Sequence, residues 1–185
     1  MVKEARTSKR RPRDQRVPSH LVLRRSRIDS VGCYTKVSIK EGELIVEYTG
    51  PRLKVKMAET LYDDDPRTYL FGLDGGKEVI DGVGVAAFIN HSCDPNCETD
   101  EVNGRIIIRA IRDIGRGEEL TYDYNLYDGS PEDEARCLCS SKNCRGSMYS
   151  EDELKRRAKA QKQRAEKARK NGNSGGQRRR TATRS

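Results

Sequence analysis

The stretch that decides the fold is FINHSCDPNC, from Phe88 to Cys97 of this 185-residue chain. An apolar segment ends there in an amide, an imidazole, a hydroxyl and a thiol, supplied by consecutive residues from Asn90 to Cys93. Taken alone, Asn90-His91 is also compatible with a hydrogen-bonded turn, because an isolated histidine is more often structural than functional. The stretch therefore marks a candidate site whose meaning depends on the rest of the chain.

A second informative stretch is GEELTYDYN, from Gly117 to Asn125. On a strand, Tyr122 and Tyr124 would face the same side, because side chains alternate between the two faces. Such a pair, taken alone, is more often a stripe of the core. We expect Asp123, on the opposite face, to be structural, and we expect Glu118-Glu119 to belong to a solvated turn.

The composition indicates an acidic body with basic ends. The net charge is +8, with +5 in residues 1–16 and +12 in residues 155–185, so the residues between them carry −9. Acidic clusters such as Asp63–Asp65 and Glu132–Glu134 favour encounters with basic peptides, whereas basic tails attract polyanions. The low hydrophobic content of 34% indicates that part of the chain is disordered.

No apolar run approaches the roughly 20 residues needed to cross a bilayer. The first sixteen residues also lack the apolar core of a secretory signal. We therefore expect no membrane association and a reducing compartment, in which the six cysteines are metal ligands, catalytic groups or buried thiols rather than disulfides.

Short apolar runs separated by turn residues predict a mostly β domain of short strands. The runs are Leu21–Leu23, Leu44–Val46, Tyr69–Leu73, Ile106–Ile108 and Leu120–Tyr122. Asn103-Gly104 predicts a hairpin turn, because both residues tolerate positive φ. One helical segment is expected near Leu53–Leu61.

The C-terminal part predicts a basic helix. Ser150–Glu153 has the pattern of a capping box, and we expect a helix from there to about Lys170, ended by Asn171-Gly172. Its apolar residues beyond Leu154 are alanines, so it should be a solvated arm. The chain then divides into a basic disordered arm (1–16), a main domain (17–127), a cysteine-rich segment (128–149), the basic helix (150–172) and a disordered basic tail (173–185).

Three cysteines crowd into one short segment: Cys137, Cys139 and Cys144. Such crowding suits a tetrahedral zinc site, which needs about four thiolates, so Cys93 or Cys97 would supply the fourth. Zinc held by four protein ligands would be structural, because no coordination position stays open. The alternative, incidental or disulfide-bonded thiols, is disfavoured because adjacent Cys-x-Cys disulfides are strained and the chain shows no export signal.

Five stretches occur in one order along the chain. They are GCYTKVSIKEGELIVEYTG (Gly32–Gly50), YLFGLD (Tyr69–Asp74), FINHSCDPNC, GEELTYDY and CLCSSKNCRG (Cys137–Gly146). This set resembles the SET-domain protein-lysine methyltransferase family with its post-SET zinc cluster, from about Val17 to Tyr149. The resemblance implies a SET-domain β fold over 17–127, a zinc-binding post-SET segment over 128–149, and a pseudoknot in which the NHSC segment threads beneath the loop that carries ELTYDY.

The resemblance also implies a cofactor, the methyl donor S-adenosylmethionine. The residues matching the family's cofactor contacts are Val31, Gly32, Tyr69, Asn90, His91 and Leu138. The chain departs from the family's Gly-x-Gly-x-x-Ala cofactor loop at two places, where Ser30 and Thr35 replace the first glycine and the alanine.

The resemblance assigns the chemistry to two tyrosines. Tyr124 matches the catalytic tyrosine, and Tyr122 matches the position that sets how many methyl groups are added. Cys93 matches the fourth zinc ligand, beside the three clustered cysteines. The implied function is a S-adenosylmethionine-dependent protein-lysine N-methyltransferase that acts on a basic tail of a histone or histone-like protein, mainly for mono- to dimethylation.

Two other functions remain open. One is a catalytically silent SET module that binds proteins, against which the intact Asn90, His91 and Tyr124 argue. The other is a nucleic-acid-binding factor. The basic tails could contact DNA non-specifically, but they lack the aromatic interleaving of a sequence reader. We expect a monomer, placed on the chromosome in the nucleus of a eukaryote or at the nucleoid in the cytoplasm of a bacterium.

Overall fold

The computed structural model describes residues 17–62, 69–127, 129 and 133–174. The chain forms two compact units. The first comprises the described residues up to Asp123 together with Cys137–Gly146, and the second comprises Tyr124–Arg136 and the described residues from Ser147 onward. The expected arm at 1–16, the acidic cluster Asp63–Asp65 and residues 175–185 lie outside the described residues, as does Glu132.

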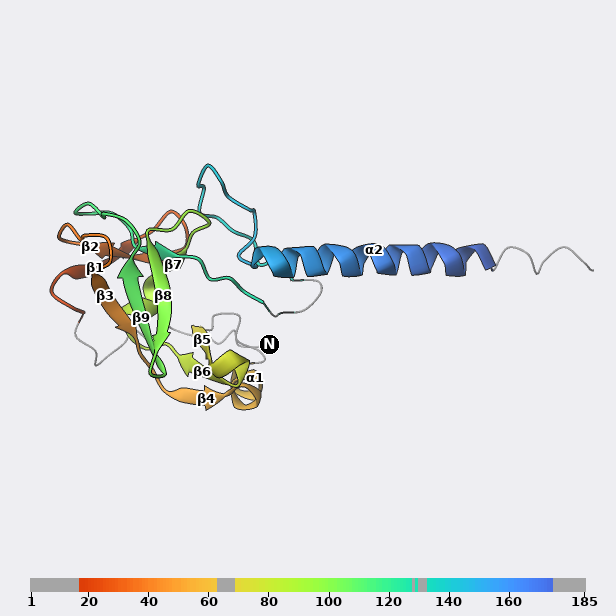
Figure 1. Cartoon of the computed structure of the whole chain (residues 1–185), viewed down its shortest axis with the longest axis horizontal. Helices are drawn as coiled ribbons and strands as arrows, with labels where there is room; N and C mark the ends of the chain where they lie inside the picture. Colours follow the sequence, from red (N-terminus) through yellow and green to blue (C-terminus); the bar gives the residue numbers. More distant parts are fainter. Residues whose placement is uncertain (1–16, 63–68, 128, 130–132, 175–185) are drawn as a thin grey trace, which may run out of the picture. The chain divides into compact units, whose positions relative to one another are not determined.

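In its described part, the first unit is built mainly from short strands in three sheets (Figure 1). Its elements are β1 (Leu21–Arg25), β2 (Val31–Thr35), β3 (Leu44–Tyr48), β4 (Arg52–Lys54), α1 (Val55–Tyr62), β5 (Leu70–Leu73), η1 (Asp74–Gly76), β6 (Glu78–Asp81), η2 (Val85–Phe88), β7 (Asn90–His91), β8 (Cys97–Val102), β9 (Arg105–Ala110) and β10 (Thr121–Tyr122). The predicted mostly β class is confirmed. The expected helix near Leu53–Leu61 begins at Val55, because Leu53 pairs with β6.

The sheets follow the order of the chain only in part. β1 and β2 form an antiparallel pair, β6 lies between β4 and β5, and the largest sheet has the order β3-β9-β8-β10-β7. The β8–β9 hairpin turns at Asn103-Gly104, whose φ angles of 52° and 69° confirm the predicted turn. In β9, Ile106, Ile107 and Ile108 are all buried, which explains their continuous apolar run.

The largest sheet contains one parallel pair that matters for the candidate site, formed by β10 and β7. Thr121 pairs with Asn90 and Tyr122 with His91, so the two stretches that mark the candidate site lie side by side. This is the adjacency that the expected pseudoknot requires. The expected strand face with two tyrosines is wrong, however: β10 ends at Tyr122, and the backbone has left the extended conformation at Asn125, where φ is 45°.

The second unit contains the predicted C-terminal helix, α2 (Glu151–Ser174), drawn in blue in Figure 1. Its side chains from Ala158 to Lys170 are exposed, so the expected solvated arm is confirmed. The expected stop at Asn171-Gly172 is wrong, because the helix continues to Ser174. A glycine within a helix costs about 1 kcal/mol relative to alanine, which is too little to end a helix by itself.

The start of α2 shows only half of the predicted capping box. The Ser150 hydroxyl accepts a hydrogen bond from the Glu153 N–H at 3.2 Å. The Ser150 N–H, however, donates to the Leu126 carbonyl, and the buried Glu153 carboxylate binds Arg156 and Arg157 instead. No helix in the described part of the chain is long and apolar enough to span a membrane.

We expect Ile108→Ala to destabilise the first unit by about 2–5 kcal/mol. The side chain of Ile108 is 0% exposed, so its truncation leaves a cavity in the core. Val102→Ala, at the exposed end of β8, is the control and should change stability by no more than about 0.5 kcal/mol. Urea unfolding followed by circular dichroism measures both. Equal effects of the two substitutions would contradict this placement of the core.

Candidate active site

The buried side chain of Asn90 is the centre of the first cluster. Its Nδ2 donates to Glu119 Oε1 at 2.8 Å, and the carbonyl oxygens of Val31 and Asp29 lie 3.3 Å and 3.5 Å from the same nitrogen. Strand β7 thereby meets the start of β2. Gly32 lies in the same cluster, so the structure brings together three of the predicted cofactor residues: Val31, Gly32 and Asn90.

Gly32 is a glycine for a steric reason. A Cβ atom on this residue would lie 2.1 Å from Glu119 Oε1 and 3.1 Å from Asn90 Nδ2. The carboxylate thus occupies the space that any other side chain would need. The close approach at Gly32 agrees with its predicted place in a cofactor loop, although the loop begins with Ser30 in place of glycine.

Glu119 corrects one sequence prediction. It does not belong to a solvated turn: its carboxylate is half-buried and also accepts a hydrogen bond from the Tyr34 hydroxyl at 2.8 Å. Partial burial and this carboxylate raise the pKa of Tyr34. Glu118, in contrast, binds Arg112 at the surface, as a turn residue does. Local sequence patterns do not reveal this difference between Glu118 and Glu119, because the partners of Glu119 lie 29 and 85 positions away.

The buried imidazole of His91 lies beside a thiol and a carboxylate. Its Nε2 lies 3.4 Å from Cys93 Sγ, and its Nδ1 lies 3.5 Å from a carboxylate oxygen of Asp123. Burial is the main cause that lowers the pKa of His91 to about 4; the charge of Asp123 opposes this shift, and the charge of Arg145 adds to it. The imidazole is therefore neutral at physiological pH.

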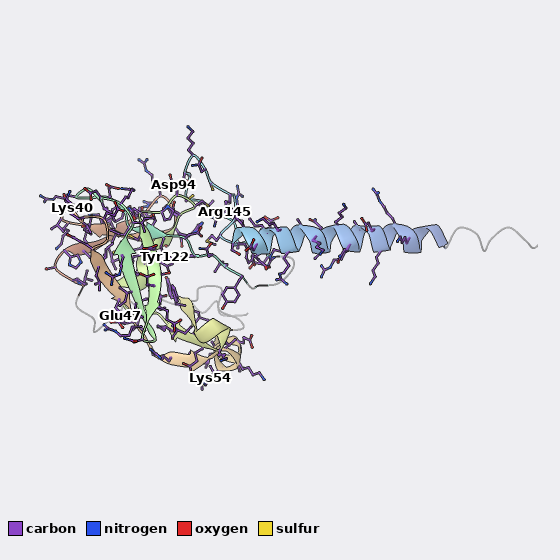
Figure 2. The ribbon with its side chains drawn as sticks, viewed as in Figure 1. Lys40, Glu47, Lys54, Asp94, Tyr122 and Arg145 are labelled. Carbon is purple, nitrogen blue, oxygen red and sulfur yellow. The ribbon has the colours of Figure 1, made fainter. Side chains whose placement is uncertain are left out.

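Arg145, labelled in Figure 2, connects the cysteine-rich loop to the end of β10. Its Nη1 and Nη2 donate to the two oxygens of Asp123 at 2.6 Å and 2.8 Å, and its backbone N–H lies 3.4 Å from Cys93 Sγ. Paired guanidinium–carboxylate hydrogen bonds of this kind fix orientation as well as distance. Asp123 therefore has the structural role expected of it.

Four cysteines gather at one point of the first unit: Cys93, Cys137, Cys139 and Cys144, with all four Sγ atoms within 4.8 Å of one another. Cys93 Sγ lies 3.7 Å from that of Cys137 and 4.0 Å from that of Cys144. A zinc tetrahedron with Zn–S bonds of about 2.3 Å has edges of about 3.8 Å, so the donor set fits zinc.

Cys97, the other sequence candidate, lies elsewhere. It is 1% exposed in β8, and its thiol donates to Asn96 Oδ1. Burial raises the pKa of Cys97 to about 12, so it stays a thiol. Burial also raises the pKa of Cys93. At Cys139 burial acts in the same direction, but the Ser141 hydroxyl and nearby backbone N–H groups outweigh it and lower the pKa to about 5.

The remaining predicted residues differ in exposure. Tyr122, labelled in Figure 2, is buried, and its ring centroid lies 6.2 Å from that of Phe71. Tyr69 is 37% exposed, and its ring lies 5.7 Å from that of Phe88. Leu138 is 55% exposed within the cysteine loop. Tyr124 is half-buried and belongs to the second unit.

Comparison with known proteins gives a family and several relatives. The model of the SET domain matches residues 30–125, more than half of the chain. A histone-lysine N-methyltransferase of Saccharomyces cerevisiae, described as H3 lysine-4 specific, is 42% identical over 140 residues, which are 68% of this chain and 13% of the relative. An Emericella nidulans protein of the same description is 42% identical over 135 residues, 66% of this chain and 11% of the relative.

The histone-lysine N-methyltransferase ash1 of Drosophila melanogaster is 42% identical over 127 residues, which are 62% of this chain and 6% of the relative. The chain thus spans only a small part of the length of these relatives. The matched region contains both stretches that meet in the parallel pair of β7 and β10, together with the β2 residues that contact Asn90. The chain belongs to the SET domain family.

Proposed function

We propose that this protein is a S-adenosylmethionine-dependent protein-lysine N-methyltransferase whose substrate is a basic tail of a histone or histone-like protein. The observation that carries the proposal is the parallel pairing of β7 with β10, which sets Asn90 and His91 beside Thr121 and Tyr122. The matching relatives are described as histone-lysine N-methyltransferases, which supports the same reaction and substrate class.

The cluster of Val31, Gly32 and Asn90 would hold one end of the cofactor. It offers backbone carbonyls, a side-chain amide and, at Gly32, a residue without a side chain that packs against the Glu119 carboxylate. His91 would support this cluster from β7, and Tyr69 and Leu138 would line the rest of the cofactor site. S-adenosylmethionine, when bound, supplies the methyl group as part of a sulfonium cation.

The protein must then prepare the lysine. Its amine must be neutral to attack, although a free lysine has a pKa of about 10.4. A narrow channel between aromatic rings favours the neutral form by desolvation, and a cation nearby disfavours a second charge. We assign the orientation of the amine lone pair to the Tyr124 hydroxyl and the shape of the channel end to the buried Tyr122. Alignment for in-line transfer supplies much of the acceleration.

The cysteines Cys93, Cys137, Cys139 and Cys144 would hold one structural zinc ion, because four protein ligands leave no open coordination position. Helix α2 supports a further property, non-specific contact with DNA. Nine lysines and arginines lie between Lys155 and Lys170, on a helix whose side chains are mostly exposed. Both a histone substrate and DNA contact fit a place on the chromosome, within the nucleus in a eukaryote.

Transfer of a labelled methyl group from S-adenosylmethionine to histones tests the proposed activity. We expect the full chain to label a basic tail, and Tyr124→Phe to lower the rate of every transfer by about 100-fold, because the amine loses its alignment. Tyr127→Phe is a matched control, since Tyr127 is an exposed tyrosine of the same unit, and it should keep the full rate. A wild-type chain that binds histones without labelling them would support a silent binding module instead.

The zinc proposal is tested by elemental analysis. We expect one zinc ion per chain, lost in Cys93→Ser and retained in Cys97→Ser, because only the first thiol belongs to the cluster. Chelation should reduce methyl transfer while the circular dichroism of the β sheets persists, since folding of the cysteine loop is linked to metal binding. Active protein without zinc would refute the proposal.

Tyr122 predicts the number of methyl groups. A tyrosine hydroxyl at this position can hold a water molecule beside the lysine nitrogen, where a further methyl group would otherwise lie. Displacing a well-bound water costs about 1–2 kcal/mol, or roughly tenfold to thirtyfold in rate. We therefore expect mainly monomethyl-lysine with slower dimethylation, and a shift of Tyr122→Phe toward di- and trimethyl-lysine. A mass-spectrometric time course measures this, and mostly trimethyl-lysine from the wild-type chain would contradict it.

A further inference from the structure

The carboxylate of Glu119 lies at the candidate cofactor cluster and has no role in the chemistry described so far. One of its oxygens, Oε1, accepts from Asn90 Nδ2 and rests against the backbone of Gly32. The other, Oε2, accepts from the hydroxyl of Tyr34. Two hydrogen bonds thus hold this half-buried carboxylate in one place, against the backbone of the buried Gly32.

The charge of Glu119 is not matched by the side chains that hold it. Its hydrogen-bond donors are a neutral amide and a neutral phenol. Within the described ranges, no lysine, arginine or histidine forms an ion pair with Glu119, whereas its neighbour Glu118 pairs with Arg112. Hydrogen bonds from neutral donors stabilise a partly buried carboxylate but do not neutralise its charge, so a cationic group is the ligand that this position favours.

The cluster also contains more acceptors than donors. The oxygens of Asp29, Val31 and Glu119 all lie within 3.5 Å of Asn90 Nδ2. A side-chain amide nitrogen carries two hydrogens, so the three acceptors must share them. A primary ammonium group brings three donors and a positive charge, which answers both the surplus of acceptors and the unmatched carboxylate.

We infer that Glu119 binds the α-ammonium group of S-adenosylmethionine, together with the Val31 carbonyl, and that Tyr34 positions the carboxylate. This inference rests on the proposed function, because it names a contact within the proposed cofactor site. The competing explanation is that Glu119 only ties β2 to β7. The two explanations differ in one respect: a tie between strands affects all ligands alike, whereas an ammonium contact affects only ligands that carry the ammonium.

The test uses calorimetric binding of two ligands to the full chain. One is S-adenosylhomocysteine, and the other is its analogue without the amino group, 5′-deoxy-5′-(3-carboxypropylthio)adenosine. We expect the wild-type chain to bind S-adenosylhomocysteine at least about tenfold more tightly than the analogue, as befits a hydrogen bond to a charged group. Glu119→Gln should weaken S-adenosylhomocysteine by about tenfold and leave the analogue unchanged.

Two further variants complete the design. Glu118→Gln, the matched control, removes the neighbouring carboxylate and should bind both ligands as the wild type does. Tyr34→Phe keeps the Glu119 carboxylate but removes one of its donors, and should weaken only S-adenosylhomocysteine, by about twofold to tenfold. Thermal unfolding and metal content confirm that each variant is folded.

The outcomes separate the inference from the proposed function. A wild-type chain that binds neither ligand overturns the proposed cofactor and the inference together. A wild-type chain that binds both ligands equally overturns the inference alone, whatever the variants do. The same holds if Glu119→Gln keeps the wild-type preference, or if it weakens both ligands to the same extent, because Glu119 is then a tie between strands and not a ligand contact.

Discussion

The candidate site depends on a parallel strand pair that is too short to be stable through its own backbone hydrogen bonds. β7 and β10 have two residues each, and the buried side chain of Asn96, in the loop that follows β7, holds the start of β10 in place. Its Nδ2 donates to the Glu119 carbonyl at 2.8 Å, and its Oδ1 accepts from the Thr121 N–H at 2.9 Å, so one amide clamps the chain on both sides of Leu120. A buried amide with both ends bonded is costly to displace, so the loop after β7 stays fixed to the segment that leads into β10.

A second connection leads from the same strand to the cysteine loop. Asp123 follows β10 directly and binds Arg145, which follows Cys144 in the sequence. The ion pair is mostly shielded from solvent, with side-chain exposures of 21% and 18%, so it is less screened than a surface pair. The contacts of Arg145 therefore connect the cysteine cluster to the end of β10, so the proposed zinc ion would also support the geometry beside His91.

Sequence patterns predicted the features that depend on neighbouring residues. The Asn103-Gly104 turn, the short strands and the start of a C-terminal helix follow from local conformational preferences. Two of the errors concern contacts between distant residues. Glu119 was expected in solvent because nothing near it in sequence reveals Asn90 or Tyr34. Only half of the predicted capping box forms, because the Ser150 N–H donates to the Leu126 carbonyl.

The electrostatics of the cluster agree with a reaction between two groups that are both cationic when free in water. Burial keeps His91 neutral, and Arg145 is neutralised by Asp123, so neither adds a positive charge beside Asn90. Glu119 leaves the cluster with an excess negative charge. A negative potential would attract both the sulfonium of the proposed cofactor and a lysine from solvent. Desolvation then favours loss of the proton from the amine, because the ammonium is the form that burial penalises. Attraction from solvent and desolvation at the reacting nitrogen would thus act on different stages of the proposed reaction.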